Sequence, residues 1–222
     1  MQSEIMFAGF GGQGILLSGK LLAHAAMEEG AEVCWIPSYG PEMRGGTAYC
    51  TVVIGDRPIG SPIIRNPRHL IAMNRPSLEK FAPVVKPEGV ILVNTSLIPI
   101  DCGRDDVDEL KVPTVEIANK LGNVRCANIV ALAAFVARTE VVSVESLRDC
   151  VKAEFARFAD RRSRTTILLT CRASSAKKGS FADRVRIAQA FSVTGCHQEK
   201  PYPPLRLVGS RWGMVSSGHE TW

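Results

Sequence analysis

None of the seven cysteines in this chain of 222 residues has a close neighbour of its own kind. The nearest two, Cys34 and Cys50, are 16 residues apart, so the C-x-x-C spacing typical of zinc knuckles and iron–sulfur ligands is missing. The odd number of cysteines favours reduced thiols over a disulfide framework. The sequence therefore predicts no metal site and small, mostly buried thiols, with one catalytic cysteine as the alternative.

Long apolar runs are missing as well. The longest covers residues 129–137, whereas a helix that crosses a bilayer needs about 20 apolar residues. The first residues include the acidic Glu4 and reach Gly9 without a basic stretch and an apolar core, so they do not resemble a secretory signal. We therefore expect a cytoplasmic protein without membrane contact.

Most of the chain also lacks an excess of positive charge. Residues 1–158 contain 16 Lys and Arg against 18 Asp and Glu, whereas residues 159–222 contain 11 against 4. The formal net charge of +5 thus arises in the last 64 residues, where the basic side chains are scattered. Because nucleic-acid binding needs a clustered basic surface, this distribution argues against a nucleic-acid partner.

What is present is an alternation of strands and helices. The chain begins with an expected buried strand over residues 3–8, a glycine-rich turn, a helix over residues 15–29 and a strand over residues 31–36. Further strands are expected over residues 47–54, 68–73, 89–94 and 114–117, and further helices over residues 76–81, 127–138 and 144–158. This order predicts the α/β class, with a Rossmann-like, mostly parallel sheet flanked by helices.

The hydrophobic periodicity is lost after Phe158, where the charge balance also changes. We expect residues 1–158 to form a single domain and residues 159–222 to form a poorly ordered basic tail. Native segments are usually locally consistent, so this abrupt change favours a shifted reading frame over a genuine basic extension.

Residues 9–14 have the sequence G-F-G-G-Q-G and lie between the first strand and the first helix. Such glycines let the backbone turn tightly, and the helix that follows offers free N–H groups to an anion. A dinucleotide site would also need an acid at the end of the second strand, but residues 35–38 read W-I-P-S. An NAD site is therefore disfavoured, and a tight turn that only needs small residues remains the alternative.

Residues 38–46, S-Y-G-P-E-M-R-G-G, form a second unusual segment between two expected strands. Loops at strand ends of an α/β scaffold are common binding positions, and Arg44 can pair with a phosphate or a carboxylate. A surface loop with a solvated arginine is an equally good interpretation. Asn94 follows another apolar strand, where a capped turn before Pro99 is the favoured interpretation.

Together, the two segments resemble the gamma subunit of the 2-oxoacid:ferredoxin oxidoreductases, most closely its 2-oxoglutarate branch, with the 2-ketoisovalerate and pyruvate branches near. The resemblance covers about residues 3–158 and includes residues 59–62, 71–77, 93–96, 116–118, 121–123 and 127–128. The combination of both motifs is far more specific than either alone. It implies that residues 1–158 are a gamma-type catalytic domain with a Rossmann-like fold.

The resemblance implies a subunit that is inactive alone. The family decarboxylates a 2-oxoacid oxidatively to an acyl-CoA with thiamine diphosphate, and passes electrons through iron–sulfur clusters to ferredoxin. Coenzyme A is then a co-substrate, while thiamine diphosphate and the clusters belong to partners, namely the alpha, beta and ferredoxin-like delta subunits. This chain has no cysteine cluster and no G-D-G…N thiamine diphosphate motif, since Gly55 and Asp56 are followed by Arg57.

The resemblance also implies the site residues. The anion-facing loop would contain Gly9, Gly11, Gly12, Gln13 and Gly14, and a loop facing coenzyme A and the partners would contain Ser38, Tyr39, Arg44, Gly45 and Gly46. Asn94 and Asn128 are further candidates.

Two alternatives remain open. An indolepyruvate oxidoreductase beta subunit has the same glycine-rich start, but the Y-G-P-E sequence at residues 39–42 argues against it. A stand-alone nucleotide-binding module is the second alternative, and it would behave as a monomer with affinity for nucleotides.

Overall fold

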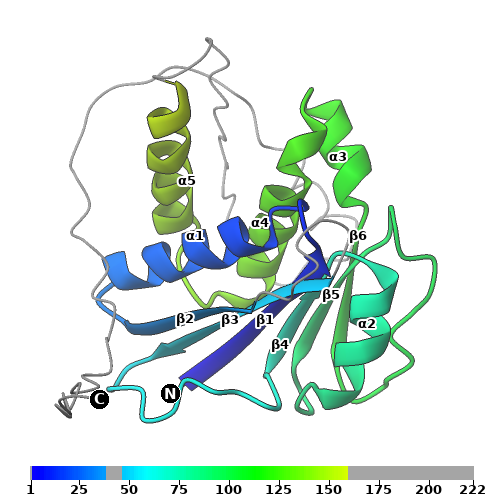
Figure 1. Cartoon of the computed structure of the whole chain (residues 1–222), viewed down its shortest axis with the longest axis horizontal. Helices are drawn as coiled ribbons and strands as arrows, with labels where there is room; N and C mark the ends of the chain where they lie inside the picture. Colours follow the sequence, from blue (N-terminus) through cyan, green and yellow to red (C-terminus); the bar gives the residue numbers. More distant parts are fainter. Residues whose placement is uncertain (1, 39–46, 160–222) are drawn as a thin grey trace, which may run out of the picture.

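The structure, a computed structural model, describes residues 2–38 and 47–159 (Figure 1). Its six strands form one sheet in the order β2-β3-β1-β4-β5-β6. These strands are β1 (Gln2–Phe10), β2 (Glu32–Ser38), β3 (Thr47–Gly55), β4 (His69–Ala72), β5 (Val90–Asn94) and β6 (Asp108–Val112). The strands β1, β4, β5 and β6 pair in parallel, and β3 runs antiparallel to both β1 and β2. Among the described strands, β3 alone is therefore antiparallel to the rest, which confirms the mostly parallel sheet.

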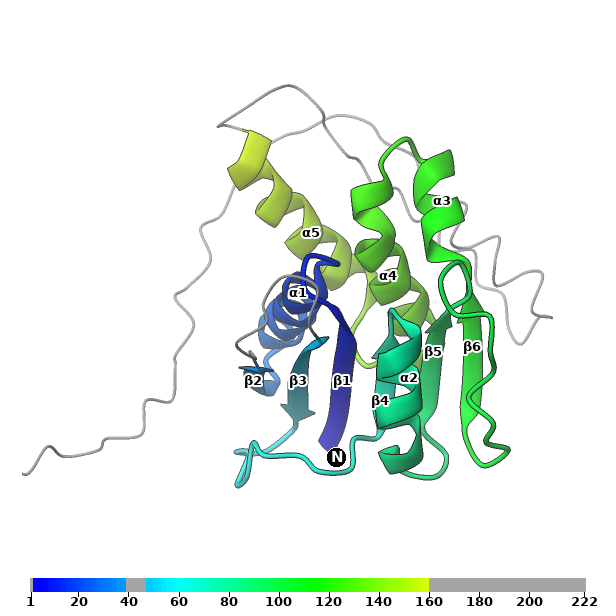
Figure 2. The same cartoon turned by 45° about the vertical axis from the view of Figure 1, so that its right-hand side comes forward.

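Helices lie on both sides of this sheet. They are α1 (Ile15–Glu28), α2 (Arg75–Phe81), α3 (Thr114–Lys120), α4 (Ala127–Thr139) and α5 (Val144–Ala159), with 3₁₀ turns η1 (Ala82–Val84) and η2 (Val124–Cys126). Figures 1 and 2 show α1, α4 and α5 on one side of the sheet and α2 on the other. The expected α/β class and helix-flanked architecture in a single domain are confirmed.

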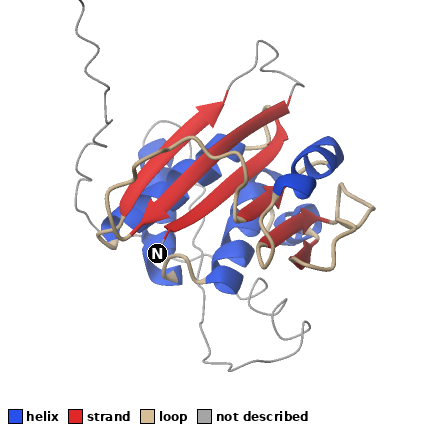
Figure 3. Cartoon of the chain, turned by 90° about the horizontal axis from the view of Figure 1, so that it is seen from below, coloured by secondary structure: helices blue, strands red, loops and turns tan. Residues whose placement is uncertain are grey.

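Two apolar layers form because the central strands are buried on both faces. In β1, Ile5 and Phe7 belong to the core under α1, α4 and α5, whereas Met6 and Ala8 belong to a second core under α2. Successive side chains of a strand point to opposite faces, so the continuous apolar run of β1 fills both cores. Seen from below, the second face of β1 and β3 is crossed by the extended connection of residues 56–68 (Figure 3).

One expected element is wrong. Residues 114–117, expected as a short strand, begin α3 instead, although Thr114, Val115 and Ile117 are β-branched. The preceding strand is β6, whose D-E-L-K-V sequence alternates polar and apolar residues at the edge of the sheet. Its Val112 is buried, and Leu110 packs against the same core, so two apolar side chains suffice to fix this strand. The remaining expected helices and strands agree with the structure within a few residues at their ends.

None of the helices within residues 2–38 and 47–159 combines the length and the apolar character needed to cross a membrane. The expected tail, residues 159–222, lies outside the described residues apart from Ala159, the last residue of α5.

Candidate functional site

The glycine loop and Ser38, the first residue of the second motif, lie at one edge of the sheet, where β1, β2 and the other parallel strands have their carboxyl ends. Because β3 runs the opposite way, it begins at this edge: Thr47 pairs with Phe10, and Tyr49 pairs with Ser38. Gly9 and Phe10 still belong to β1, where Gly9 pairs with Ala48, so the glycine loop itself consists of residues 11–14; residues 39–46 connect Ser38 to Thr47. The antiparallel strand β3 therefore places Ser38 and Thr47, which flank residues 39–46, at the same edge of the sheet as the glycine loop. Carboxyl ends of strands in open α/β sheets are the usual place for ligands.

The glycine loop leads directly into the amino end of α1. Gly12 has a φ of +98° and Gly14, the N-cap residue of α1, has a φ of +74°. No side chain caps this helix, and its first turn contains no acidic residue. The N–H groups of a first helical turn lack intrahelical partners and carry the positive end of the helix dipole. This end of α1 is therefore suited to an anion such as a phosphate.

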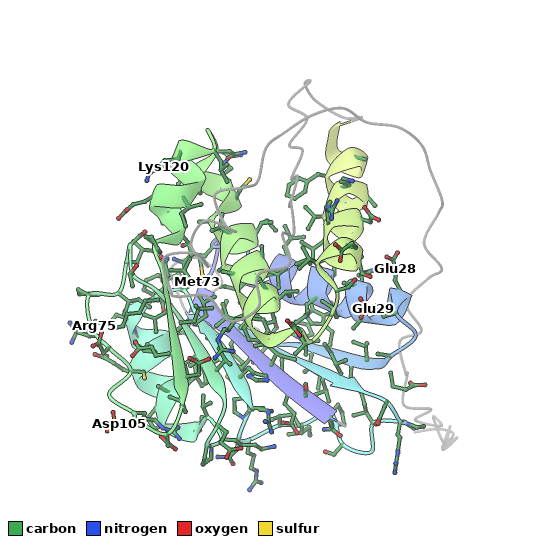
Figure 4. The ribbon with its side chains drawn as sticks, turned by 180° about the vertical axis from the view of Figure 1, so that it is seen from behind. Glu28, Glu29, Met73, Arg75, Asp105 and Lys120 are labelled. Atoms are coloured by element: carbon green, nitrogen blue, oxygen red, sulfur yellow. The ribbon has the colours of Figure 1, made fainter. Side chains whose placement is uncertain are left out.

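The side chain of Gln13 turns back onto the protein. Its Oε1 accepts a hydrogen bond from the N–H of Phe10 at 2.7 Å, and its Nε2 donates a long hydrogen bond to the carbonyl oxygen of Met73 at 3.5 Å. Met73 follows β4, and Figure 4 labels it near the end of β1. Gln13 thus joins the glycine loop to the neighbouring strand end.

Asn128 holds the other end of the loop. Its Nδ2 donates to the carbonyl oxygen of Gly14 at 3.1 Å, and its own carbonyl oxygen accepts from the hydroxyl of Ser18 at 3.3 Å. Asn128 is 4% exposed and lies in the first turn of α4. The structure thus brings this predicted site residue to the glycine loop, in contact with its backbone.

Asn94 ends β5 and is fully buried. Its Oδ1 accepts from the N–H of Ser96 at 3.2 Å, and its Nδ2 donates to the Met73 carbonyl oxygen at 3.5 Å. The capped turn expected from the sequence is therefore present. Asn94 and Gln13 share one backbone acceptor, so the ends of β1, β4 and β5 are linked at this point.

Sequence reasoning missed three buried polar residues along the same edge, Asn74, Ser77 and Thr114. Asn74 caps α2 by accepting from the N–H of Ser77 at 2.9 Å. Among the described residues, Asn74 Nδ2, Ser77 Oγ and Thr114 Oγ1 have no hydrogen-bond partner. The available signal was the position of Asn74 and Thr114 just after strand ends, but the β-strand assignment of residues 114–117 hid Thr114.

Four of the five thiols in the described part of the chain have raised pKa values. Burial raises the pKa of Cys50 to about 12 and also raises the pKa of Cys34 and Cys126. Burial is likewise the main cause of the raised pKa of Cys102, where the carboxylate of Glu109 adds to it. A nucleophilic thiol needs a lowered pKa, so none of these four is suited to catalysis.

No three Cys, His, Asp or Glu side chains within the described part of the chain come together in a way that could hold a metal ion. The donor set of these residues therefore does not fit an iron–sulfur cluster, which is normally held by four cysteine thiolates.

Three large apolar side chains near this edge are exposed. Phe10 is 38% exposed at the start of the glycine loop, Leu97 is 49% exposed after β5, and Val124 is 52% exposed just before α4. Of the remaining predicted site residues, Ser38 is half-buried at the end of β2, whereas Tyr39, Arg44, Gly45 and Gly46 lie outside the described residues.

Comparisons with known proteins agree with this fold and motif arrangement. The model of the pyruvate ferredoxin/flavodoxin oxidoreductase family matches residues 4–161. This chain belongs to that family. A solved relative is the keto/oxoacid ferredoxin oxidoreductase gamma subunit of Geobacter sulfurreducens, with a TM-score of 0.59 and 33% sequence identity over 68% of this chain and 85% of that one. The resemblance to the gamma subunits is thereby confirmed.

Curated members of the pyruvate ferredoxin/flavodoxin oxidoreductase family differ in length. The 2-oxoglutarate synthase subunit KorC of Methanocaldococcus jannaschii is 39% identical over 156 residues, which cover 68% of this chain and 82% of that protein. The ketoisovalerate oxidoreductase subunit VorA of Methanothermobacter thermautotrophicus is 43% identical over 154 residues, 69% of this chain but only 32% of that protein. The chain thus spans about a third of the ketoisovalerate subunit and most of the 2-oxoglutarate subunit.

Proposed function

We propose that this chain is the gamma subunit of a multi-subunit 2-oxoacid:ferredoxin oxidoreductase that converts 2-oxoglutarate to succinyl-CoA. The observation that carries the proposal is the 39% identity to a 2-oxoglutarate synthase subunit that the chain matches over 82% of its length. The higher identity to VorA supports the same class of reaction, and it makes 2-ketoisovalerate the competing substrate.

In this proposal, the chain contributes a binding surface for coenzyme A. The amino end of α1 offers backbone N–H donors without a competing acid or side-chain cap, which suits a phosphate group of coenzyme A. Ser38 ends β2 at the same edge, and Tyr39, Arg44, Gly45 and Gly46 belong to the motif that connects it to Thr47. Arg44 adds a guanidinium, which pairs with phosphates in a bidentate manner.

The redox chemistry is assigned to partners. Thiamine diphosphate supplies the carbanion chemistry for decarboxylation, and iron–sulfur clusters carry electrons to ferredoxin. We assign these groups to the alpha, beta and ferredoxin-like delta subunits, because the described residues offer no cluster of metal ligands. The complex is assigned to the cytoplasm.

The exposed apolar side chains support a subunit role. Phe10, Leu97 and Val124 follow strand ends or precede α4, close to the proposed coenzyme A surface. Aromatic and aliphatic side chains of this kind are enriched in the cores of protein interfaces. We propose that they contact a partner subunit beside the coenzyme A surface.

The test is purification of the native complex through this chain, identification of its subunits, and measurement of CoA-dependent ferredoxin reduction. Four substrates should be compared: 2-oxoglutarate, 2-ketoisovalerate, pyruvate and indolepyruvate. The proposal expects the highest kcat/KM for 2-oxoglutarate. Preference for 2-ketoisovalerate or indolepyruvate would overturn the substrate, and a monomeric chain that binds nucleotide without partners would overturn the subunit role.

A further inference from the structure

Two carboxamide side chains hold the glycine loop from opposite ends. Gln13 accepts from the N–H of Phe10 at 2.7 Å and donates to the carbonyl oxygen of Met73 at 3.5 Å. Both polar atoms of this side chain are therefore occupied by the backbone of the same chain. Asn128 donates to the Gly14 carbonyl oxygen at 3.1 Å, from a helix that is 114 residues away in sequence.

Two glycines of the motif lie directly against these side chains. A Cβ atom added at Gly9 would lie 2.6 Å from Gln13 Oε1, and one added at Gly14 would lie 2.4 Å from Asn128 Nδ2. Both distances are shorter than any normal carbon contact, so a side chain at either position would displace the carboxamide or the loop. The glycines and the carboxamides thus fit each other as two pairs, Gly9 with Gln13 and Gly14 with Asn128.

The space beside Gly12 is different. An added Cβ there would meet no atom within 4 Å, although the φ of +98° still favours glycine. Gly12 lies between the two constrained glycines, Gly9 and Gly14, and is exposed. The loop is thus held at its ends and open in its middle, where its backbone can be approached from outside.

We infer that Gln13 and Asn128 are positioning residues, which fix the glycine loop so that its backbone N–H groups point toward the ligand without touching the ligand themselves. This inference rests on the proposed function, in which that ligand is a phosphate of coenzyme A. A preformed loop loses little conformational entropy when an anion binds, so the two carboxamides strengthen binding through the backbone. Under this inference, Gln13 supports the backbone groups that contact the ligand and does not contact the ligand itself.

The first experiment compares wild-type Gln13 with Gln13→Met in the assembled complex. Methionine has nearly the same length and no charge, so it removes both hydrogen bonds without altering the electrostatics of an anion site. Hydrogen exchange of the peptide with residues 10–16, measured without coenzyme A, should become roughly tenfold faster, in line with the loss of about one net hydrogen bond. The KM for coenzyme A should rise by a similar factor while kcat is retained.

The matched control uses a carboxamide far from the loop. Asn66 Nδ2 donates to the carbonyl oxygen of Val84 at 3.1 Å, just before β4, at the opposite edge of the sheet. Asn66→Leu removes the same type of bond and should change neither the exchange of residues 10–16 nor the KM. Asn128→Leu should reproduce the effects of Gln13→Met and gives an independent reading if that variant does not assemble.

A double-mutant cycle tests the fit of Gly14 against Asn128. Gly14→Ala introduces a steric clash with Asn128 and backbone strain, whereas Gly14→Ala combined with Asn128→Ala keeps only the strain. The effect of Gly14→Ala on the KM for coenzyme A should therefore be several-fold smaller in the Asn128→Ala background. Equal effects in both backgrounds would overturn the pairing.

The outcomes separate this inference from the proposed function. Unchanged exchange in Gln13→Met would overturn the positioning role, whatever the KM, and so would faster exchange with an unchanged KM. A raised KM with unchanged exchange would instead indicate direct contact between Gln13 and coenzyme A. If the wild-type complex showed no dependence on coenzyme A, the proposed function would fail, and the exchange data would still decide whether Gln13 holds the loop.

Discussion

At Gly12, the surrounding space would accept a side chain, but the backbone conformation favours glycine. A side chain there has open space, but a φ of +98° is strained for any residue with a Cβ and most of all for a β-branched one. The strain is of the order of 1–2 kcal/mol, which a domain with two cores tolerates. Gly12→Val should therefore leave the fold intact and lower acyl-CoA formation by the complex at least about tenfold.

The control for this substitution is Gly103→Val. Gly103 has a φ of +68° and equally open space, and it lies two residues before Asp105, which Figure 4 labels well apart from Met73. It should cause a similar small loss of stability with normal turnover. Normal acyl-CoA formation by Gly12→Val would show that the loop is only a tight turn.

The buried His69 should make the stability of this domain depend on pH. It is 6% exposed on β4, its Nδ1 accepts from the N–H of Val90 at 3.1 Å, and its ring packs edge-on against Phe135. Burial, with a smaller contribution from the charge of Arg68, lowers the pKa of His69 from 6.5 to about 4. The unfolded chain therefore takes up this proton at a higher pH than the folded chain does.

This difference fixes the sign of the pH dependence. The contribution of His69 to stability is fully present above pH 6.5, decreases as the pH falls toward 4, and is constant below that; its total is at most about 3 kcal/mol. Unfolding by denaturant at several pH values should show this decrease, and His69→Gln should lose most of it. An NMR titration in which the folded His69 ring gains its proton near pH 6.5 would contradict the prediction.

The contacts of Gln13 and Asn128 show what could not be predicted from the sequence. Spacing and residue type were enough to predict the glycine loop and its place between a strand and a helix. They were not enough to predict that Gln13 reaches Met73 or that Asn128 reaches Gly14, because these contacts join residues 60 and 114 positions apart. Such contacts depend on the order of strands in the sheet, which local patterns do not determine.

At the scale of elements, strong apolar periodicity made α1, α4, α5 and the central strands predictable. The errors lie at the edge of the sheet, where β6 needs only two apolar side chains and its polar residues resemble a loop. In α3, the β-branched Thr114, Val115 and Ile117 have a strand propensity that packing overrides. Buried Ile117 and Ala118 face the core one helical turn after Thr114, and this contact decides in favour of the helix.

The last described helix, α5, is held by its apolar face more than by its charges. Leu147, Cys150 and Val151 of α5 are buried in the core between the sheet and α1, α4 and α5, and Lys20 of α1 pairs with Glu154 at 3.0 Å. Partly exposed ion pairs contribute less than about 1 kcal/mol, whereas removing a buried leucine side chain costs about 2–5 kcal/mol. Leu147→Ala should therefore lower the free energy of unfolding by several times more than Lys20→Met does. Equal losses, measured by urea unfolding, would show that the ion pair fixes α5.

At the scale of the whole molecule, we predict that residues after the α5 helix contribute little to stability or assembly. The prediction rests on the sequence, which loses its hydrophobic period there and changes to 11 basic against 4 acidic residues. A chain that ends at residue 161, where the family match also ends, should keep its melting temperature and its partner subunits. A packed segment of that size would bury apolar surface, so its removal would lower the melting temperature by several degrees. Such a drop, or an insoluble truncated chain, would show that the extension is a structural part of the protein.

The purified chain without partners should have no 2-oxoacid oxidoreductase activity and should contain no iron. The described residues bring no group of metal ligands together, and the sequence has neither a cysteine cluster nor a thiamine diphosphate motif. Iron analysis and ferredoxin reduction assays on the isolated chain provide the measurement. Stoichiometric iron in this chain alone would contradict the prediction, and adding back the partner subunits should restore turnover.

The central position of β1 has a consequence for how the protein is made. β1 precedes every other described strand in the sequence, but its neighbours come much later, since Phe10 pairs with Thr47 and Ala8 pairs with Ala72. During synthesis, β1 thus leaves the ribosome before either neighbour exists. Its first neighbour, β3, is complete only when Gly55 has emerged, and its second, β4, only after Ala72. Pairing of distant segments is slow, and apolar strands that wait for partners are prone to aggregate. A nascent chain halted before Gly55 is therefore the form of this protein that depends most on a chaperone.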